Sequence, residues 1–220
     1  MPHKGNSHYD VILDECRWMI REVGGEVMHH CYREKNGVAD LLAKQTATTE
    51  NSAELEQRQE KFDIIVENLA DPVEGGPCYQ LYTQSFYENI VKPKLDDTGI
   101  FVTQAGPARV FTHKKVFSSI YNTIKQVFKY VWAYTAHVPS FADTWGWVMA
   151  SDQPFCLDAG KMDKKIAERI EGELLYLNGA SFFSSTILNK TIAKTIKNES
   201  HVYTEDNARF IHGHGVTFRN

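Results

Sequence analysis

The sequence predicts an α/β fold with a mostly parallel sheet, preceded by a small separate segment. After residue 60, short apolar runs typical of strands alternate with amphipathic helical patterns, as in doubly wound sheets. The composition is that of an ordinary globular protein, with 220 residues of which 42% are hydrophobic and 24% charged. Residues 45–60 contain no aromatic side chain and mark a boundary. We therefore expect an N-terminal unit over 1–47, a linker over 48–60 and a main domain over 61–216.

The N-terminal unit is expected to fold as helix, strand and helix. Apolar residues recur at helical spacing over 8–23, and Gly24-Gly25 would end that helix. Residues 26–33 alternate as in a strand, and Asn36 suits the N-cap of a second helix. A unit this small does not supply a stable core by itself.

The main domain begins with the apolar run Phe62–Val66, which predicts a buried strand. The later elements follow from the same kind of pattern. We expect helices over 83–95 (broken near Pro93), 113–128, 162–175 and 185–197, and strands over 99–104, 130–138 and 146–151. Strands that alternate with helices indicate a mostly parallel sheet.

Charge and cysteine usage exclude several classes of protein. The net charge of −4 and the pI near 6.1 lack the basic balance of a nucleic-acid module. The four cysteines are scattered without a CxxC pair, which favours free thiols in a reducing compartment. No signal-peptide pattern and no apolar run of about 18 residues occurs. We expect a cytoplasmic protein with no membrane contact.

A polar loop, Glu67–Pro72, directly follows the first strand of the main domain. In doubly wound folds, ligands bind beyond the carboxyl ends of the strands, so this loop is a candidate site. An equally good alternative is a turn in which Asp71 simply caps the backbone before Pro72.

Residues 68–95, 99–152 and 208–216 resemble the spermidine synthase family, including its plant thermospermine-forming members. The resemblance covers about 52–216 and is nearly continuous. It implies a Rossmann sheet like that of S-adenosylmethionine methyltransferases. It also implies transfer of an aminopropyl group from decarboxylated S-adenosylmethionine, the co-substrate, to a polyamine such as spermidine. No permanently bound cofactor is implied.

The resemblance assigns roles to several residues. In the family, an Asp directly before the Leu of this loop is the proposed base, and here that position is Asn68. An amide does not accept a proton, and Glu67 would point elsewhere from an extended segment. Asp71, the second acidic position, is kept. Polyamine contacts are assigned to Gln104, Phe141, Asp143 and Trp145, and adenine contacts to Pro77 and Leu81.

The chain also departs from the family. It contains no GxGxxG-like loop, and we expect the family's ribose-binding acid to be absent too. We therefore predict a truncated and catalytically impaired aminopropyltransferase. The alternative is a non-catalytic remnant that binds polyamine, forms a homo-oligomer, or pairs with an intact homologue.

Residues 9–46 resemble the C-terminal end of a plant ribonuclease H-like domain, chiefly through His30–Asp40. In that reading Asp40 would be the last metal-binding carboxylate, but one carboxylate does not hold two Mg²⁺ ions. We therefore expect no metal there. A nucleic-acid-binding module remains a further alternative, although residues 1–50 carry six Lys/Arg against eight Asp/Glu. We expect no metal at His201, His212 and His214 either.

Overall fold

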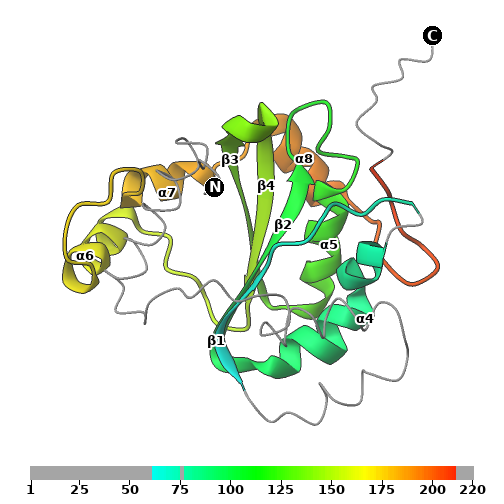
Figure 1. Ribbon diagram of the computed structural model, residues 1–220, viewed down its shortest axis with the longest axis horizontal. Coiled ribbons are helices and arrows are strands. Elements are labelled where there is room, and N and C mark those ends of the chain that lie inside the picture. Colours follow the sequence, from blue (N-terminus) through cyan, green and yellow to red (C-terminus); the bar gives the residue numbers. More distant parts are fainter. Residues whose placement is uncertain (1–60, 75–76, 212–220) are drawn as a thin grey trace, which may run out of the picture. The chain divides into compact units, whose positions relative to one another are not determined.

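The computed structural model describes residues 61–74 and 77–211 (Figure 1). The elements that we expected over 8–23, 26–33 and 38–45, and the linker over 48–60, lie outside these residues. The described chain divides into two compact units. One comprises residues 156–184; the other comprises 61–155 together with 185–211 and contains the sheet.

Four strands make up the sheet of the described residues, in the order β1-β2-β4-β3. Their bounds are β1 Phe62–Glu67, β2 Leu95–Pro107, β3 Tyr130–Val138 and β4 Asp143–Ser151. β1 pairs with β2 in parallel, whereas β4 pairs antiparallel with both β2 and β3. β1, β2 and β3 therefore run in one direction and β4 runs against them. Two of the three pairings are antiparallel, so the described sheet is mixed, and the expectation of a mostly parallel sheet is wrong for these strands.

The reversal at β4 follows from the length of its connection to β3. Only the single turn η4, Pro139–Phe141, separates the two strands. Two neighbouring parallel strands need a connection of a dozen or more residues. The connection here is much shorter, so β3 and β4 form an antiparallel hairpin. The expected strand at 146–151 is confirmed, and it starts three residues earlier, at Asp143.

Helical turns connect β1 to β2, where a helix over 83–95 was expected. They run from η1 through a π turn to the turn that holds Pro93. Their bounds are η1 Pro77–Tyr82, α4 Gln84–Phe86, η2 Tyr87–Val91 and η3 Lys92–Lys94. The expectation is confirmed, although the regular α-helical part is short.

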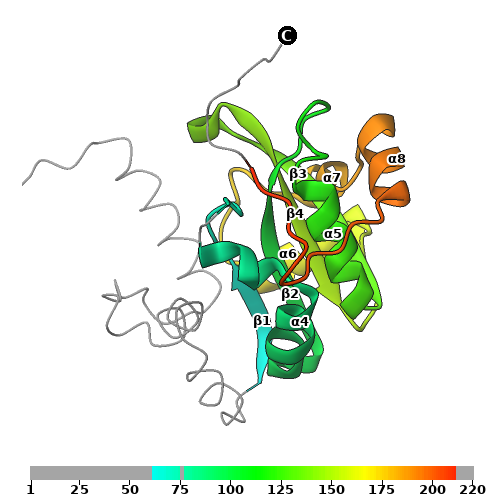
Figure 2. The ribbon, with the colours of Figure 1, turned by 90° about the vertical axis from the view of Figure 1, so that its right-hand side faces the viewer.

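The crossover from β2 to β3 contains α5, Phe117–Val127, and α8 is Lys190–Asn198. α5 lies against one face of the sheet, and α8 packs beside α5 (Figure 2). α5 starts four residues later than expected, because the residues before it form a separate turn in which the backbone N–H of His113 bonds to Arg109 O. α5 buries Phe117, Ile120 and Ile124 completely. This face of α5 forms the core with Phe101 and Val148 of the sheet.

On the opposite face of β1, apolar side chains are exposed in the part of the chain that the structure describes. Ile64 is 62% exposed and Val66 68% exposed, so the prediction that β1 is buried is wrong for these side chains. Successive side chains of a strand point to opposite faces. Ile65 therefore packs against the core while its two neighbours point to the other face.

The unit at 156–184 contains α6, Ala159–Arg169, and most of α7, Gly179–Ser185. We expected helices over 162–175 and 185–197. The first begins and ends earlier, and the second corresponds to α8, which begins five residues later than expected. The helix α7 was not expected. The N-cap Asp158 explains where α6 begins, because its carboxylate accepts a hydrogen bond from the Lys161 N–H at 2.7 Å. Asp163 accepts a hydrogen bond from Gly179 N at 2.6 Å, which joins the two helices.

Candidate functional site

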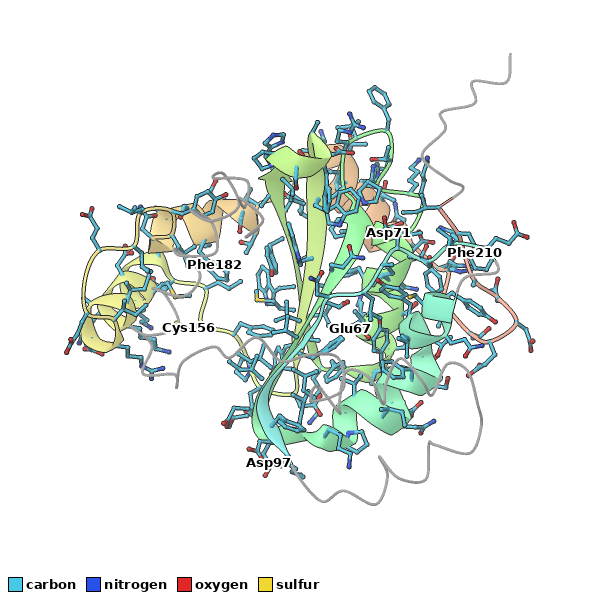
Figure 3. All side chains as sticks on the ribbon, in the orientation of Figure 1. Glu67, Asp71, Asp97, Cys156, Phe182 and Phe210 are labelled. Atoms are coloured by element: carbon cyan, nitrogen blue, oxygen red, sulfur yellow. The ribbon has the colours of Figure 1, made fainter. Side chains whose placement is uncertain are left out.

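A cluster of polar and aromatic side chains gathers where β1 and β2 end and β4 begins. Parallel strands place their carboxyl ends at one edge of a sheet, and the antiparallel β4 starts at the same edge. Figure 3 shows Glu67 near the end of β1 and Asp71 in the loop beyond it. Gln104 of β2 and Trp145 of β4 complete the cluster. The structure thus brings together most residues that the sequence singled out for polyamine binding.

Gln104 connects the parts of this cluster. Its Nε2 donates to Leu69 O at 2.6 Å, to Asp71 Oδ1 at 3.2 Å and to the Tyr82 hydroxyl at 3.1 Å. Its Oε1 accepts from Trp145 Nε1 at 2.6 Å and from a backbone N–H at 3.2 Å. The side chain is 6% exposed, and both ends of its amide are engaged within the protein. The polyamine contact assigned to Gln104 stays a prediction, and here the amide holds the loop and β4 in place.

Tyr82 is a member of the cluster that the sequence analysis missed. Its side chain is fully buried, and its hydroxyl donates to Ala70 O at 3.2 Å while accepting from Gln104. Burial raises the pKa of this hydroxyl, so it stays a neutral donor. The sequence offered one signal for Tyr82, which is a tyrosine in an apolar stretch. If such a tyrosine is buried, its hydroxyl needs a hydrogen-bond partner inside the protein.

Gly106 allows the loop to approach the sheet. Its φ of +81° lies in the left-handed region that favours glycine. A Cβ there would lie 2.6 Å from Val116 Cγ2 and 3.5 Å from Asp71 Oδ1. The sequence Ala105-Gly106-Pro107 therefore ends β2 in a shape that leaves room for the Asp71 carboxylate.

Asp143 opens β4 and is nearly buried, with 10% of its side chain exposed. Its Oδ1 accepts from Thr144 N at 2.6 Å and forms an ion pair with Arg109 Nε at 2.5 Å. Two residues further on, the Trp145 ring lies 4.7 Å from the ring of the exposed Phe141, centroid to centroid. The sequence analysis singled out Phe141, Asp143 and Trp145, but neither Arg109 nor Thr144.

Glu67 and Asn68 differ sharply in their surroundings. Asn68, at the position of the family's base, is exposed. The Oε2 of Glu67 is shielded from solvent and has no hydrogen-bond partner. Burial raises the pKa of the Glu67 carboxyl from its ordinary 4.5 to about 8, and a hydrogen bond with Thr103 opposes the shift. Adjacent strand residues point to opposite sides, so Glu67 does not occupy the place of Asn68.

The residues assigned to the adenine ring lie in η1. Pro77 opens this turn and Leu81 lies near its end. Leu81 is buried, with 6% of its surface exposed. The structure thus places Leu81 beside Tyr82, on the same helical turns that approach the loop.

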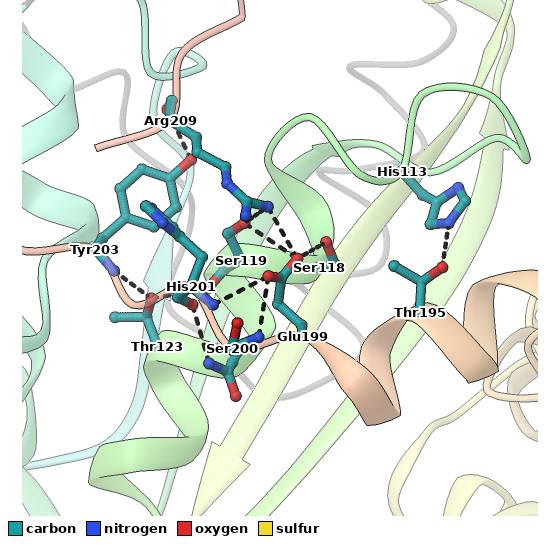
Figure 4. A network of polar contacts seen from close by, with 11 residues as sticks. His113, Ser118, Ser119, Thr123, Thr195, Glu199, Ser200, His201, Tyr203 and Arg209 are labelled. Carbon is teal, nitrogen blue, oxygen red and sulfur yellow. Dashed lines mark hydrogen bonds and ion pairs between the residues drawn. The ribbon is translucent and has the colours of Figure 1, made fainter. Parts of the chain in front are cut away.

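The segment Glu199–Ile211 is attached to α5 through the polar contacts of Glu199, Tyr203 and Arg209 that Figure 4 shows. Glu199 accepts hydrogen bonds from Ser118 at 2.6 Å and pairs with Arg209 at 3.0 Å. At the far end of the segment, Ile211 N donates to Pro72 O at 2.9 Å. These contacts join the segment both to α5 and to the loop that follows β1.

No group of three or more potential metal ligands occurs among residues 61–74 and 77–211. His212, His214 and Asp40 lie outside that range. Within the same described residues, Cys78 and Cys156 are free thiols. In the part of the chain that the structure covers, the helices are all too short or too polar to cross a membrane.

The spermine/spermidine synthase domain is the family whose sequence model matches this chain, over residues 11–158. The chain belongs to the spermine/spermidine synthase family. This match includes the site loop, β2 and β4. It also spans most of the segment that we assigned to a ribonuclease H-like fragment, and the comparisons give that fragment no support. The domain boundaries at 47 and 60 stay a prediction.

Thermospermine synthase ACAULIS5 of Arabidopsis thaliana is 62% identical over 201 residues, which cover 90% of this chain and 59% of that protein. The polyamine aminopropyltransferase of Sulfurisphaera tokodaii is 34% identical over 155 residues, covering 70% of this chain and 50% of that protein. The chain therefore spans less than two thirds of the length of these relatives.

Among solved structures, the spermidine synthase from Thermotoga maritima matches with a TM-score of 0.54 at 18% identity, covering 73% of this chain and 56% of that one. A spermidine synthase in complex with the transition-state analogue AdoDATO matches with a TM-score of 0.50 at 19% identity. That match covers 66% of this chain and 46% of the other. At these identities the likeness establishes the fold, a mixed α/β sheet of the Rossmann-like type.

Proposed function

We propose that this chain carries the acceptor side of an aminopropyltransferase site. The reaction transfers the aminopropyl group of decarboxylated S-adenosylmethionine to an amine of spermidine or a related polyamine and releases methylthioadenosine. The observation that supports it best is the Gln104 amide, which joins Asp71 of the loop to Trp145 of β4. A carboxylate beside an aromatic wall suits a flexible cation.

The chemistry of the acceptor explains what the site must do. An alkyl ammonium group has a pKa near 10, so the acceptor amine is mostly protonated at neutral pH and must lose a proton before it attacks. A carboxylate that both orients the amine and takes the proton accelerates such a step by about 10²–10⁴-fold. The sulfonium leaving group departs as a neutral thioether and needs no acid.

Asn68 weakens the removal of the proton from the acceptor amine. Its amide hydrogen-bonds an ammonium through its oxygen but does not accept the proton. Asp71 is the second acidic position of the loop, and its Oδ1 accepts a hydrogen bond from the Gln104 amide at 3.2 Å. The Glu67 carboxyl is buried and holds its proton at neutral pH. We therefore propose a site that recognises the acceptor and transfers slowly or not at all.

The test is methylthioadenosine release by the full chain mixed with decarboxylated S-adenosylmethionine and spermidine. We expect no product above background from the native chain and product from Asn68→Asp. Asn198→Asp, an exposed site at the end of α8, is the matched control and should stay inactive. Product from the native chain would refute the role given to Asn68. Product from neither chain would refute the expectation that Asn68→Asp alone restores transfer.

The second candidate is a non-catalytic protein that binds polyamine, alone or paired with a full-length homologue. It is favoured by the exposed amide of Asn68 next to a retained Asp71. It predicts saturable spermidine binding without product from Asn68→Asp. Binding that fails to saturate would exclude it, and mixing with an active homologue followed by size-exclusion chromatography tests the pairing.

A further inference from the structure

The ion pair between Arg109 and Asp143 has a consequence for the cation site. Asp143 is the first residue of β4, and its side chain points to the same face of the strand as that of Trp145, two residues on. Trp145 in turn is bonded to Gln104, and Gln104 to Asp71. Asp143 therefore belongs to the cluster that we propose for the polyamine.

The negative charge of the Asp143 carboxylate is already paired with a positive charge of the same chain. With 10% of its side chain exposed, it requires a partner, because an unpaired buried charge is strongly unfavourable. Arg109 Nε supplies the opposite charge at 2.5 Å and Thr144 N adds a hydrogen bond at 2.6 Å. Both contacts fall on Oδ1, so a cation that binds this oxygen has to take the place of the guanidinium.

The backbone of Arg109 is held in place, whereas its side chain is exposed and can move away from Asp143. Its carbonyl oxygen accepts from Thr112 N at 3.1 Å and from His113 N at 2.9 Å, which fixes the turn before α5. The Arg109 side chain is nevertheless 57% exposed. The guanidinium is therefore largely solvated, and an ammonium group that replaces it keeps the nearly buried carboxylate paired.

Arg109 also lines a cavity of about 310 Å³ whose other walls include Val110, Phe111 and Leu188. Asp143 and Trp145 are not among the residues that line it. The cavity therefore offers space for a displaced Arg109 side chain and is not part of the proposed cation site.

We propose that Arg109 is an internal competitor for the acceptor polyamine: it occupies Asp143 in the free protein and must be displaced by an ammonium group of the ligand. This inference rests on the proposed function, because it takes the ligand to be a polyamine. Arg109 thereby lowers the affinity of the site and selects for ligands with enough charge to replace a guanidinium.

Isothermal titration of the full chain with spermidine tests the inference. Arg109→Gln should bind spermidine roughly five- to tenfold more tightly than the native chain, and Arg109→Lys should restore the native affinity. Lys114→Gln is the matched control, because it removes an exposed positive charge from the same loop and should change affinity far less. In an Asp143→Asn background, the Arg109→Gln change should have no effect.

Each outcome separates the two proposals. Equal affinity of the native chain, Arg109→Gln and Lys114→Gln would overturn the competitor role while leaving polyamine binding in place. Absence of saturable binding in every variant would overturn both. Because Arg109→Gln leaves Asp143 unpaired, thermal unfolding with and without spermidine is measured as well. The inference predicts a larger upward shift of Tm in Arg109→Gln than in the native chain.

Discussion

The buried carboxyl of Glu67 provides a prediction about stability that does not depend on any ligand. The change is Glu67→Gln, which keeps the shape of the side chain and removes its proton equilibrium. Burial raises the pKa of the folded carboxyl to about 8, while the unfolded chain keeps the ordinary value of 4.5. A raised carboxyl pKa means that the folded state favours the protonated form, and Oε2 has no partner to stabilise the charge.

The sign follows from proton linkage. The folded state has its full stability below pH 4.5 and loses it as the pH rises toward 8, because ionisation is then available only to the unfolded chain. At about 1.4 kcal/mol per pH unit, holding the proton at pH 7 costs the native chain about 3 kcal/mol. Glu67→Gln avoids this loss, so its advantage over the native chain grows between pH 4.5 and 8.

The assay is urea-induced unfolding of both chains at pH 5, 7 and 8.5, followed by tryptophan fluorescence. We expect Glu67→Gln to be slightly more stable at pH 5 and more stable by about 3 kcal/mol at pH 7. Glu88→Gln removes an exposed carboxylate from η2 and serves as control. A constant difference between Glu67→Gln and the native chain at all three pH values would refute the reasoning.

Other predictions concern the frame of the site. Gly106→Ala should destabilise the fold by about 1–3 kcal/mol in urea unfolding, since its Cβ would meet Val116 and its φ is positive. Tyr82→Phe should cost about 1 kcal/mol through the lost bond to Ala70 O, measured in the same way, and should weaken spermidine binding. Burial by itself raises the pKa of Glu199. The hydrogen bonds that Glu199 accepts from Ser118 and from the backbone, together with the charge of Arg209, outweigh this effect, so the pKa is lowered. That stabilisation is present above pH 4.5 and disappears as the pH falls through the lowered value, so Glu199→Gln should flatten acid unfolding there.

Local pattern predicted the elements of the sheet well. β3 occupies the expected 130–138 without change, and α5 presents the expected apolar face, because both signals come from side chains close in sequence. The direction of β4 was not predictable in this way. Strand pairing depends on the length of a connection and on which edge is free, and the apolar run at 146–151 carries neither kind of information.

Some members of the candidate site stood out in the sequence, whereas others and the contacts between them did not. Asp71 and Asp143 stood out through their place in recognisable stretches of sequence. Their partners did not, because Arg109 lies 34 positions from Asp143 in the chain and the Gln104 amide reaches Tyr82 across 22 residues. Hydrogen bonds over such separations are set by the packed fold. The burial of Glu67 is a similar case, since its strand pattern gave no sign of which face would be covered.

The most direct test of the central claim, that the loop at Asp71 receives a polyamine cation, is an equilibrium titration of the full chain with spermidine beside Asp71→Asn. We predict saturable binding to the native chain and at least about tenfold weaker binding to Asp71→Asn, because loss of a close charge pair of this kind is worth roughly 1.4 kcal/mol or more. Equal binding by both chains, or no saturable binding to the native chain, would contradict the account.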